Sequence, residues 1–568
     1  MYIATVPNRN SPPAILLREG YREHGKVKNR TLANLSHWPA EQVELLRRVL
    51  RGERLAPVDQ LFEAVASPHH GHVQAVRVAM QRLAFEPLLA SRPSRQRALV
   101  VAMVAARILE PDSKLATTRW WHTTTLPADL GVADADEDDL YAAMDWLLER
   151  QARIERKLAA RHLQEGGLVL YDVTSSYFEG STCPLAAFGH DRDGKKGKLQ
   201  VNYGLLTDAR GCPVAVSVFQ GNTGDPKTLL PHVERVRADF GIEHLVLVGD
   251  RGMISQTQIT ALQGLPGVDW ITALRTGAIR ELVAGGHLQL GLFDERNLFE
   301  LHHPDFPGER LVACRNPELA TLRARKRHAL LEATRKELEK VRGMVARGKL
   351  RGQDAIGVRV GKVINRYKVA KHFRLTIRDD GLDFPIDEAQ VAAEAALDGL
   401  YVIRTSVPPE RLGAAETVRS YKLLGQVERA FRSLKTIDLK VRPIHHRIEP
   451  RVRAHIFLCM LAYYVEWYML EAWRPLLFAD EDQAAKQTRD PVAAAARSEA
   501  TLRKVHAQVL DDGTVVHSFR TLLHQLSGIV RNVCRRRDAR SDEPTFNIVT
   551  TPDPKQQRAY ELLEAITV

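Results

Sequence analysis

The chain has 568 residues, of which 44% are hydrophobic and 26% are charged, and its formal net charge is +12. These proportions are ordinary for a soluble globular protein with a large core, and at about 150 residues per domain the length predicts three or four domains. The excess of Lys and Arg favours a polyanionic partner, most often nucleic acid.

The cysteines and the apolar segments exclude several other classes of protein. The cysteines are odd in number and form no CxxC pair, which argues against a disulfide scaffold or a zinc knuckle and predicts a reducing cytoplasm. The N-terminus lacks the apolar run of a signal peptide. Residues 456–470 are the most apolar segment, but they are fewer than about 18 and include Glu466, so they predict a buried helix rather than a membrane span. The cysteines are Cys183, Cys212, Cys314, Cys459 and Cys534.

Residues 1–165 predict a small hairpin followed by helices. Short strand-like pieces before residue 40 are interleaved with Arg, Lys and His, which predicts a hairpin with one basic face. AEQVELLRRVLRG and ALVVAMVAARILE have helical spacing, and DADEDDL is an acidic helix start. The region is either a plain helical packing domain or a DNA-binding region, and the context below favours the second.

From residue 168 the pattern changes to strands that alternate with helices. LVLYDVTSSYFEG predicts a strand that ends at Asp172, and HLVLVGDRG predicts another that ends at Asp250. Between them lie a predicted hairpin with its turn at residues 208–211 and an amphipathic helix, DPKTLLPHVERVRADFG. A helix, ISQTQITALQGL, and a strand, VDWITALR, follow. The fold class is therefore α/β, with a mixed sheet flanked by helices.

Residues 280–397 interrupt this pattern with polar strand-like pieces and a long charged helix at residues 318–349. Because this segment is rich in both positive and negative charges, it predicts either a solvated helix or a short coiled hairpin. The sheet pattern resumes at DGLYVIRTSV. We therefore expect a catalytic domain at residues 166–279 and 398–475, an insertion domain between these two segments, and a helical C-terminal region at residues 476–568.

The segment YKLLGQVERAFRSLK predicts one helix with a polar stripe. At 100° per residue, Glu428, Arg432 and Lys435 lie within about 40° of Tyr421 on one face, while the apolar residues lie on the other. On an ordinary surface helix such a stripe is merely solvated, so it identifies a site only in combination with other residues.

Three carboxylates supply that combination, because Asp172 and Asp250 each follow an apolar strand and Glu428 lies on the later helix. Two divalent ions held by such acids can activate a water or a 3′-hydroxyl and stabilise the leaving oxygen. Hard oxygen ligands suit Mg²⁺ or Mn²⁺, and a cation relieves the repulsion between neighbouring carboxylates. The alternative is that Asp172 caps a turn and Asp250 caps the next helix.

These residues resemble the DDE transposases of bacterial insertion sequences, within the insertion-sequence-four superfamily. In that superfamily the third acid lies in a motif of Tyr, two residues, Arg, three residues, Glu, six residues and Lys. Tyr421, Glu428 and Lys435 have this spacing, and Leu424 occupies the arginine position. Asp172 in YDVTSSYFEG and Asp250 in GDRGMIS match the first two acids, and the phrases ILEPDSKLATTRWW and DGLYVIRTSV also look like this group.

The resemblance implies an RNase H-like catalytic domain, with the insertion domain before the last catalytic helix. It implies hydrolysis of a phosphodiester at each end of the element, followed by attack of the 3′-hydroxyl on target DNA. Asp172, Asp250 and Glu428 would hold Mg²⁺, with Mn²⁺ able to substitute. The implied partners are double-stranded DNA with terminal inverted repeats, target DNA and a second copy of the chain, in the bacterial cytoplasm and away from membranes.

Basic residues near these acids are the candidate DNA contacts, because Lys and Arg supply salt-dependent affinity for phosphates. Four lie in the loop FGHDRDGKKGK, whose alternative interpretation is an exposed basic turn. Lys422 and Arg432 are the two candidate substitutes for the arginine that is missing at Leu424. The predicted DNA-binding residues are Tyr421, Lys435, Arg432, Arg251, Arg192, Lys195, Lys196 and Lys198.

Two rival functions remain from the sequence. One is an RNase H-like nuclease that does not transpose, and the other is a domesticated DNA-binding protein that has lost catalysis. The presence of all three acids weighs against the second. Short inverted repeats beside the gene, bounded by direct target duplications, would favour transposition.

Overall fold

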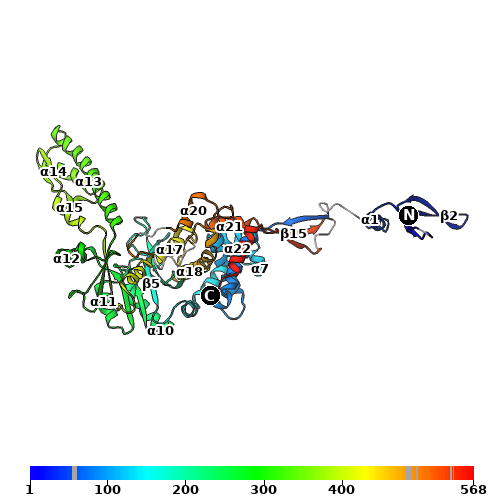
Figure 1. The fold of residues 1–568 in the computed structure, drawn as a ribbon, viewed down its shortest axis with the longest axis horizontal. Coiled ribbons are helices and arrows are strands. Elements are labelled where there is room, and N and C mark those ends of the chain that lie inside the picture. The colour runs from blue at the N-terminus through cyan, green and yellow to red at the C-terminus, as the bar shows by residue number, and fades with distance from the viewer. Residues whose placement is uncertain (10, 54–60, 481–488, 494–496, 538–539, 541–542) are drawn as a thin grey trace. The chain divides into compact units, whose positions relative to one another are not determined.

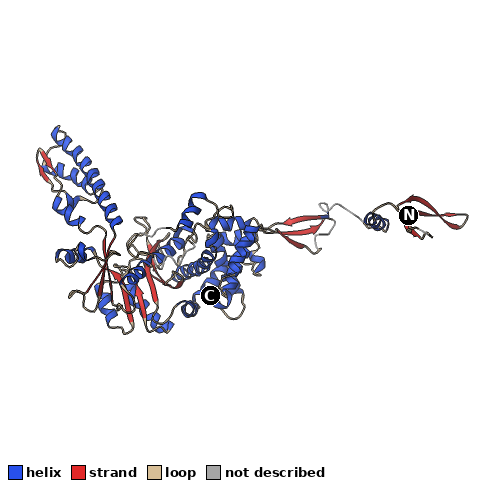
Figure 2. Ribbon diagram, viewed as in Figure 1, coloured by secondary structure: helices blue, strands red, loops and turns tan. Residues whose placement is uncertain are grey.

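The computed structural model describes residues 1–9, 11–53, 61–480, 489–493, 497–537, 540 and 543–568 (Figure 1). They form two compact units, residues 1–68 with 530–550 and residues 69–529 with 551–568. The boundary at residue 68 falls inside the range 1–165 expected from the sequence, so the helices after that point belong to the larger unit. Both units combine helices and strands (Figure 2).

The smaller unit contains two antiparallel three-stranded sheets and a helix. The predicted hairpin is present as β2 and β3, with β1 added to its edge. The second sheet joins strands from both ends of the chain, in the order β16-β15-β4. The elements are β1 (Tyr2–Val6), β2 (Ala14–Glu23), β3 (Lys26–Asn34), α1 (Ala40–Leu50), β4 (Phe62–Ala66), β15 (Arg531–Arg536) and β16 (Phe546–Val549).

The predicted basic face of this hairpin is not the face that contains Glu19 and Glu23; Arg18 and Arg22 lie on the opposite face. Lys28 forms an ion pair with Glu23 at 2.5 Å, and Arg30 forms one with Glu19 at 2.7 Å. Cations and carboxylates therefore alternate across the two strands, and the face with these two acids carries both charges.

The larger unit is built on an eight-stranded mixed sheet with the order β10-β11-β14-β9-β8-β5-β6-β7. β8 runs parallel to β5 and β9, and the other neighbours are antiparallel. The strands are β5 (Leu168–Tyr177), β6 (Gln200–Asp208), β7 (Pro213–Gln220), β8 (Leu245–Val248), β9 (Val268–Ala273), β10 (Leu298–Leu301), β11 (Arg310–Arg315) and β14 (Leu400–Thr405).

Helices cover both faces of this sheet because successive side chains of a strand point to opposite sides. On one face Tyr171 of β5 stacks on His232 of α10, with ring centroids 4.1 Å apart. On the other face Tyr203 of β6 meets Phe431 of α17 edge-on at 5.9 Å. Asp172 follows Tyr171 directly, so it points toward the side of the sheet where α17 packs. The helices after the strands are α10 (Pro226–Phe240), α11 (Gln256–Gln263), α12 (Thr276–Ala284), α16 (Ala414–Lys422) and α17 (Leu424–Arg432).

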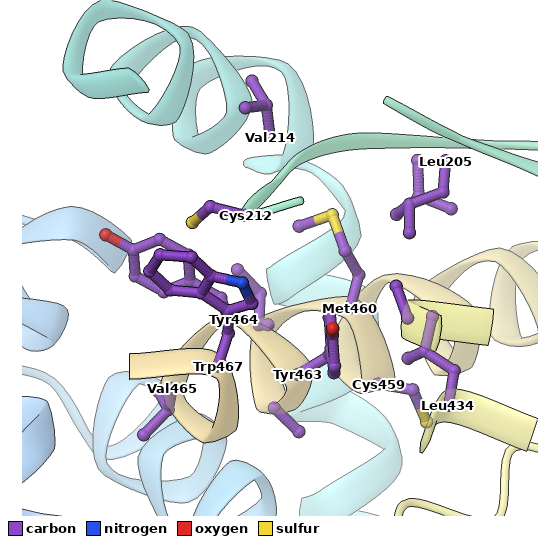
Figure 3. Packing of buried hydrophobic residues seen from close by; sticks show 14 of the residues in the cluster. Leu205, Cys212, Val214, Leu434, Cys459, Met460, Tyr463, Tyr464, Val465 and Trp467 are labelled. Atoms are coloured by element: carbon purple, nitrogen blue, oxygen red, sulfur yellow. The ribbon is translucent and has the colours of Figure 1, made fainter. Parts of the chain in front are cut away.

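A helical layer packs around α18, which carries the most apolar segment of the sequence. Every residue of α18 from Ala454 to Met469 is buried, Glu466 included. Figure 3 shows part of this core, with Leu205 of β6, Val214 of β7 and Tyr464 of α18. No helix among the described residues combines the length and the hydropathy of a membrane span. The helices are α3 (Gly71–Arg82), α4 (Phe85–Leu89), α5 (Arg95–Leu109), α6 (Lys114–Trp120), α7 (Leu126–Asp129), α8 (Glu137–Leu148), α9 (Gln151–His162), α18 (Glu449–Ala472), α20 (Glu499–Ala507), α21 (Phe519–Ser527) and α22 (Pro554–Glu564).

Only part of the range 280–397 has a separate core. The long charged helix is present as α13, which lies beside α14 (Figure 1). Leu338 and Val341 of α13 pack with Ile356 and Val360 of α14. β10 and β11 lie in the same range, but they pair with the main sheet through β14. The interruption of the sheet is therefore shorter than predicted. Its elements are α13 (Pro317–Ala346), α14 (Gln353–Ile364), β12 (Thr376–Arg378), β13 (Gly381–Asp383) and α15 (Glu388–Ala395).

The acidic helix start in DADEDDL is confirmed and gives a first testable prediction. The Asp136 side chain accepts a hydrogen bond from the Asp139 amide, and the Asp139 side chain accepts one from the Asp136 amide. Asp136→Ala leaves the Asp139 amide without its acceptor and should lower the free energy of unfolding by about 1 kcal/mol. Urea denaturation measures this, and Asp138→Ala, an exposed first-turn residue outside the capping box, is the control. An equal loss in both variants would contradict the capping role.

Candidate active site

Three carboxylates from separate elements line one open cleft of about 430 Å³. Asp172 lies on β5, Asp250 follows β8, and Glu428 lies on α17. β5 and β8 are parallel and their pairing ends at Leu170 and Val248, so both aspartates lie two positions beyond the last paired residues. Parallel strands deliver such residues to the same edge of a sheet, which is why two acids far apart in the sequence meet here.

The prediction that the first strand ends at Asp172 is wrong. β5 continues to Tyr177, because its other edge stays paired with β6 along the whole strand. Asp172 is therefore held by a strand that is paired on one side and open on the other, where β8 has already ended. This position fixes the backbone of the acid while leaving its side chain in the cleft.

The segment predicted as one helix is three consecutive helical pieces. α16 ends at Lys422, α17 runs from Leu424 to Arg432, and a π-helix spans Ser433–Ile437. Glu428, Arg432 and Lys435 all line the cleft. Tyr421 lies before the break and lines a neighbouring pocket instead. Three residues of the predicted stripe therefore line the cleft. The pKa of Tyr421 is raised by burial and also by the charges of Asp250 and Glu428, so Tyr421 still lies near these two acids.

The electrostatics of the cleft link the three acids. The pKa of Asp172 is raised to about 7, chiefly by burial, with the charges of Asp250 and Glu428 adding to the rise and Arg192 opposing it. The Val173 amide donates a hydrogen bond of 2.7 Å to Asp172 Oδ1. A carboxylate whose charged form is disfavoured by burial and by neighbouring acids gains most from a bound cation.

The donor set fits a hard divalent cation, although the site is not a closed cage. Within the described parts of the chain, no group of three or more His, Cys, Asp or Glu side chains is arranged to hold a metal ion. Magnesium-like ions take one or two protein carboxylates and complete their shells with waters and phosphate oxygens. The three acids are therefore suited to ions that arrive together with a phosphodiester.

Asp250 stabilises a turn and does not cap the helix that follows. Its Oδ1 accepts hydrogen bonds from the amides of Gly252 at 3.0 Å and Met253 at 2.7 Å. α11 begins later, at Gln256. The turn fixes the carboxylate at the mouth of the cleft, and the amides use only one of its two oxygens.

Asp193 joins two cations in the wall of the cleft. The Lys435 ammonium lies 2.6 Å from Asp193 Oδ1 and donates a hydrogen bond of 2.9 Å to Thr174 Oγ1. Arg442 forms an ion pair with the same carboxylate, whose other oxygen accepts the Tyr177 amide at 3.0 Å. The side chain of Asp193 is 2% exposed. Lys435, predicted to contact DNA, is therefore buried in this structure and held by a carboxylate.

The basic loop before β6 is only partly an exposed basic turn. Arg192 forms an ion pair with Asp225 at 2.5 Å, and both line the cleft. Lys198 pairs with Glu179 at 2.8 Å. Lys195 lies over the ring of Tyr177, and Lys196 is exposed; the ammonium of Lys195 is 5.8 Å from the ring centroid.

Sequence reasoning missed three charged residues that line the cleft: Asp193, Asp225 and Arg442. Asp193 lies inside the loop FGHDRDGKKGK, which was selected for its basic residues. The presence of an acid among those basic residues was the local signal that could have identified Asp193. Asp225 precedes the predicted helix DPKTLL, where an acid is read as a helix cap. Nothing in the local sequence marks Arg442.

A second, larger pocket of about 700 Å³ holds the remaining predicted residues, Arg251 and Tyr421. Burial and the nearby charge of Asp250 raise the pKa of Tyr421 to about 12. Leu424, at the position of the motif's arginine, packs against the hydrophobic core and supplies no cation. Arg327 and Lys371 in this lining form ion pairs with Asp398 and Glu394, which line the same pocket. The other cations of the lining are Arg280, Arg323, Lys326 and Lys368.

Glu466 beneath the π-helix gives a prediction for pH dependence. It is fully buried on α18, and it accepts a hydrogen bond from Ser433. Burial, then the charge of Asp438, raises the pKa of Glu466 well above its usual value. A raised folded-state pKa means that the stabilisation is present at low pH and is lost as pH rises above the unfolded value of about 4.5.

Glu466→Gln stays neutral throughout this range, so its stability relative to the wild type should increase as pH rises from about 4.5. Urea denaturation at a series of pH values measures the difference. A difference that does not change with pH would show that Glu466 is not buried in its protonated form.

Comparisons with known proteins agree with this geometry. The transposase DDE domain family matches residues 164–465, and the N-terminal domain of the IS1634 family of transposases matches residues 3–58. No curated protein matches the chain.

The solved structures with distant similarity include two transposase complexes. One is a piggyBac transposase synaptic complex with hairpin DNA, with 10% identity, a TM-score of 0.35, and coverage of 80% of this chain and 77% of that one. The other is the Mos1 transposase paired-end complex with the left transposon end, with 9% identity, a TM-score of 0.15, and coverage of 44% and 79%. TM-scores below 0.5 do not show a shared fold, so the assignment rests on the family matches.

The DDE domain model covers residues 164–465, more than half of the chain, and contains all three carboxylates of the cleft. The match to an insertion-sequence N-terminal domain points to the same group. The chain therefore belongs to the DDE transposases of insertion sequences, enzymes that use divalent metal ions to cut DNA and transfer its strands during transposition.

Proposed function

We propose that Asp172, Asp250 and Glu428 are the catalytic acids of this transposase and that they hold Mg²⁺, which Mn²⁺ can replace. The observation that carries the proposal is that these acids, from two strands and a helix, line one cleft. Their hard oxygen donors suit both metals. The raised pKa of Asp172 supports the same role, because a bound cation removes its cause.

The catalytic domain is RNase H-like in this proposal. Support comes from the strand order β7-β6-β5-β8-β9, with three antiparallel strands followed by two strands parallel to β5. The separate core of α13 and α14 forms the insertion domain, and residues 1–165 contribute DNA-binding surfaces. The C-terminal region from residue 476 supports the helical layer.

The chain's own residues orient a phosphodiester over the acids. Metal ions bound there supply activation of a water or 3′-hydroxyl and stabilisation of the leaving oxygen. Arg432 is exposed at the cleft and binds a phosphate oxygen. Lys435 and Arg442 make the electrostatic potential of the cleft wall more positive, and Asp193 fixes the position of both side chains. Hydrolysis at the element's end releases a 3′-hydroxyl. Its attack on a phosphodiester of target DNA would form the new P–O bond and break the target's own P–O3′ bond, with the target 3′-hydroxyl as the leaving group.

DNA follows the basic surfaces on both sides of the acids. On one side lie Arg192, Lys195, Lys196 and Lys198, and on the other the cationic pocket that contains Arg251 and Tyr421. The substrate is double-stranded DNA with terminal inverted repeats, and two copies of the chain hold the two ends in one synaptic complex. The five buried free cysteines support a reducing bacterial cytoplasm.

The proposal is tested by changing the metal preference of one acid. Asp250→Cys should lose cleavage of a labelled duplex that carries the element's terminal repeat in Mg²⁺, and should regain part of it in Mn²⁺, because a thiolate is a poor ligand for the harder ion. The wild type should cut in both metals and in neither when EDTA is added. Equal activity of Asp250→Cys and wild type in Mg²⁺ would remove Asp250 from the metal site.

A further inference from the structure

A third pocket, of about 380 Å³, lies beside the active-site cleft in the larger unit. Part of its wall is the phrase ILEPDSK between α5 and α6, which matched the family pattern but has no role in the catalytic site. Arg442 lines both this pocket and the cleft. The other polar and charged residues of the lining are Arg107, Glu110, Asp112, Ser113, Lys114, Tyr141, Lys440, His445, His446 and His455.

Two cations of this pocket are almost completely buried. Lys114 is 4% exposed and Arg107 is 6% exposed. Arg107 donates one hydrogen bond, of 2.9 Å, to the Asp112 carbonyl. In the described part of the chain, neither cation forms an ion pair with a carboxylate, since Glu110 and Asp112 are exposed at the rim.

Buried charges are normally paired, because removal of a cation from water costs several kcal/mol unless an anion compensates. Here the neighbours add to the cost: burial and the charge of Arg107 lower the pKa of Lys114 to about 7. Burial, followed by the charges of Lys114 and Arg107, lowers the pKa of His446 to about 3, so this histidine is neutral. The pocket therefore has the charge of an anion site that lacks its anion.

The neighbouring cleft determines which anion fits. A DNA strand that lies over the three acids must leave the cleft, and Arg442 marks a continuous wall from the cleft into this pocket. The pocket volume greatly exceeds the ~30 Å³ that one water occupies in the liquid, so it admits a phosphate group. Lys and Arg are the side chains that DNA-binding proteins use for phosphates.

We propose that Arg107 and Lys114 form a binding site for one backbone phosphate of the DNA strand that continues from the active-site cleft. This site rests on the proposed function for its DNA, and it adds a contact contributed by the helical layer rather than by the catalytic sheet. It gives the phrase ILEPDSK a role: Lys114 supplies charge, and the Asp112 carbonyl orients Arg107.

The test uses the full chain and a labelled duplex that carries the terminal repeat, without metal. Lys114→Met keeps the side chain's length and removes its charge. The slope of log affinity against log salt should become shallower by about 0.9, the value for one phosphate contact. Its Tm should equal or exceed that of the wild type, because an uncompensated buried charge is gone. The matched control is Arg119→Met, an exposed cation on the same helix α6 but outside the pocket, which should leave the slope unchanged.

Several outcomes separate the alternatives. An unchanged slope for Lys114→Met overturns the proposal, and a lower Tm with an unchanged slope makes Lys114 a structural residue. Inorganic phosphate could raise the Tm of the wild type but not that of Lys114→Met, while the salt slope of DNA affinity stays the same in both proteins. This result would assign the pocket to a free phosphate and would also overturn the proposal. If Lys114→Met does not fold, Arg107→Gln takes its place, because Gln keeps a donor for the Asp112 carbonyl and removes the charge.

Metal-dependent cleavage by the wild type is scored separately. If the wild type cleaves DNA and the salt slope of Lys114→Met is unchanged, only the phosphate site is refuted. If the salt slope of Lys114→Met is shallower but the wild type does not cleave DNA, only the catalytic proposal is refuted.

Discussion

Glu428→Gln should reduce DNA cleavage by at least about 1000-fold while leaving the binding of the terminal repeat intact. The Gln side chain keeps the size of Glu428 and its position on the helix, but it removes a negatively charged ligand from the metal ions. Such ions supply several kcal/mol of transition-state stabilisation. A loss of about 4 kcal/mol corresponds to this factor. The measurement is single-turnover cleavage of labelled end DNA in Mg²⁺, with affinity measured in parallel without metal.

DNA affinity should not fall, because Glu428 is exposed in a cleft that must accept phosphates and its charge repels them. Glu410→Gln is the matched control, since it removes an exposed carboxylate from the loop before α16 that does not line the cleft. Cleavage by Glu428→Gln at the rate of the control would mean that the third acid lies elsewhere. Loss of DNA affinity in step with cleavage would make Glu428 a binding residue instead.

Asp193→Asn should lower the free energy of unfolding by about 3 kcal/mol. The change leaves Lys435 and Arg442 without their shared carboxylate, and removing one partner of a buried ion pair typically costs 3–5 kcal/mol. The Lys435 side chain is 9% exposed and that of Arg442 is 20% exposed, so we expect a value at the lower end. Urea denaturation without DNA measures the loss.

The same loop supplies the control. Glu179→Gln removes the partner of Lys198 in an ion pair whose side chains are 37% and 48% exposed, and screening by water makes such a pair contribute little to stability. Similar losses of unfolding free energy for Glu179→Gln and Asp193→Asn would show that Asp193 forms only an ordinary surface ion pair. DNA added in excess should restore part of the stability of Asp193→Asn, because phosphates can replace the missing carboxylate.

The sequence by itself determined the elements whose signals are local. Apolar runs predicted β8, β9 and β14, helical spacing predicted α1, α5 and α10, and the capping acid predicted the start of α8. Residues 456–470 were correctly predicted to form a buried helix, since their length and Glu466 exclude a membrane span. The family resemblance rested on Asp172, Asp250 and Glu428 and the phrases around them, and the match of residues 164–465 to the transposase DDE domain confirms it.

Tertiary structure decided everything that depends on distant partners. β5 continues past Asp172 because β6 pairs with it, and β10 and β11 join the main sheet because β14 offers them an edge. The segment 421–435 divides into three pieces that pack against different neighbours, which moves Tyr421 to another pocket.

The partners of the basic residues were also decided by the fold. Sequence composition records that Lys435, Arg192 and Lys114 are cations, but only the packed structure gives the first two a carboxylate and leaves the third buried without one. Local sequence determines which charges the chain carries, because residue type fixes charge at neutral pH. Burial and contacts with residues far apart in the sequence determine whether a charged side chain forms an ion pair within the protein or remains available for DNA. Both desolvation and ion pairing depend on three-dimensional distance.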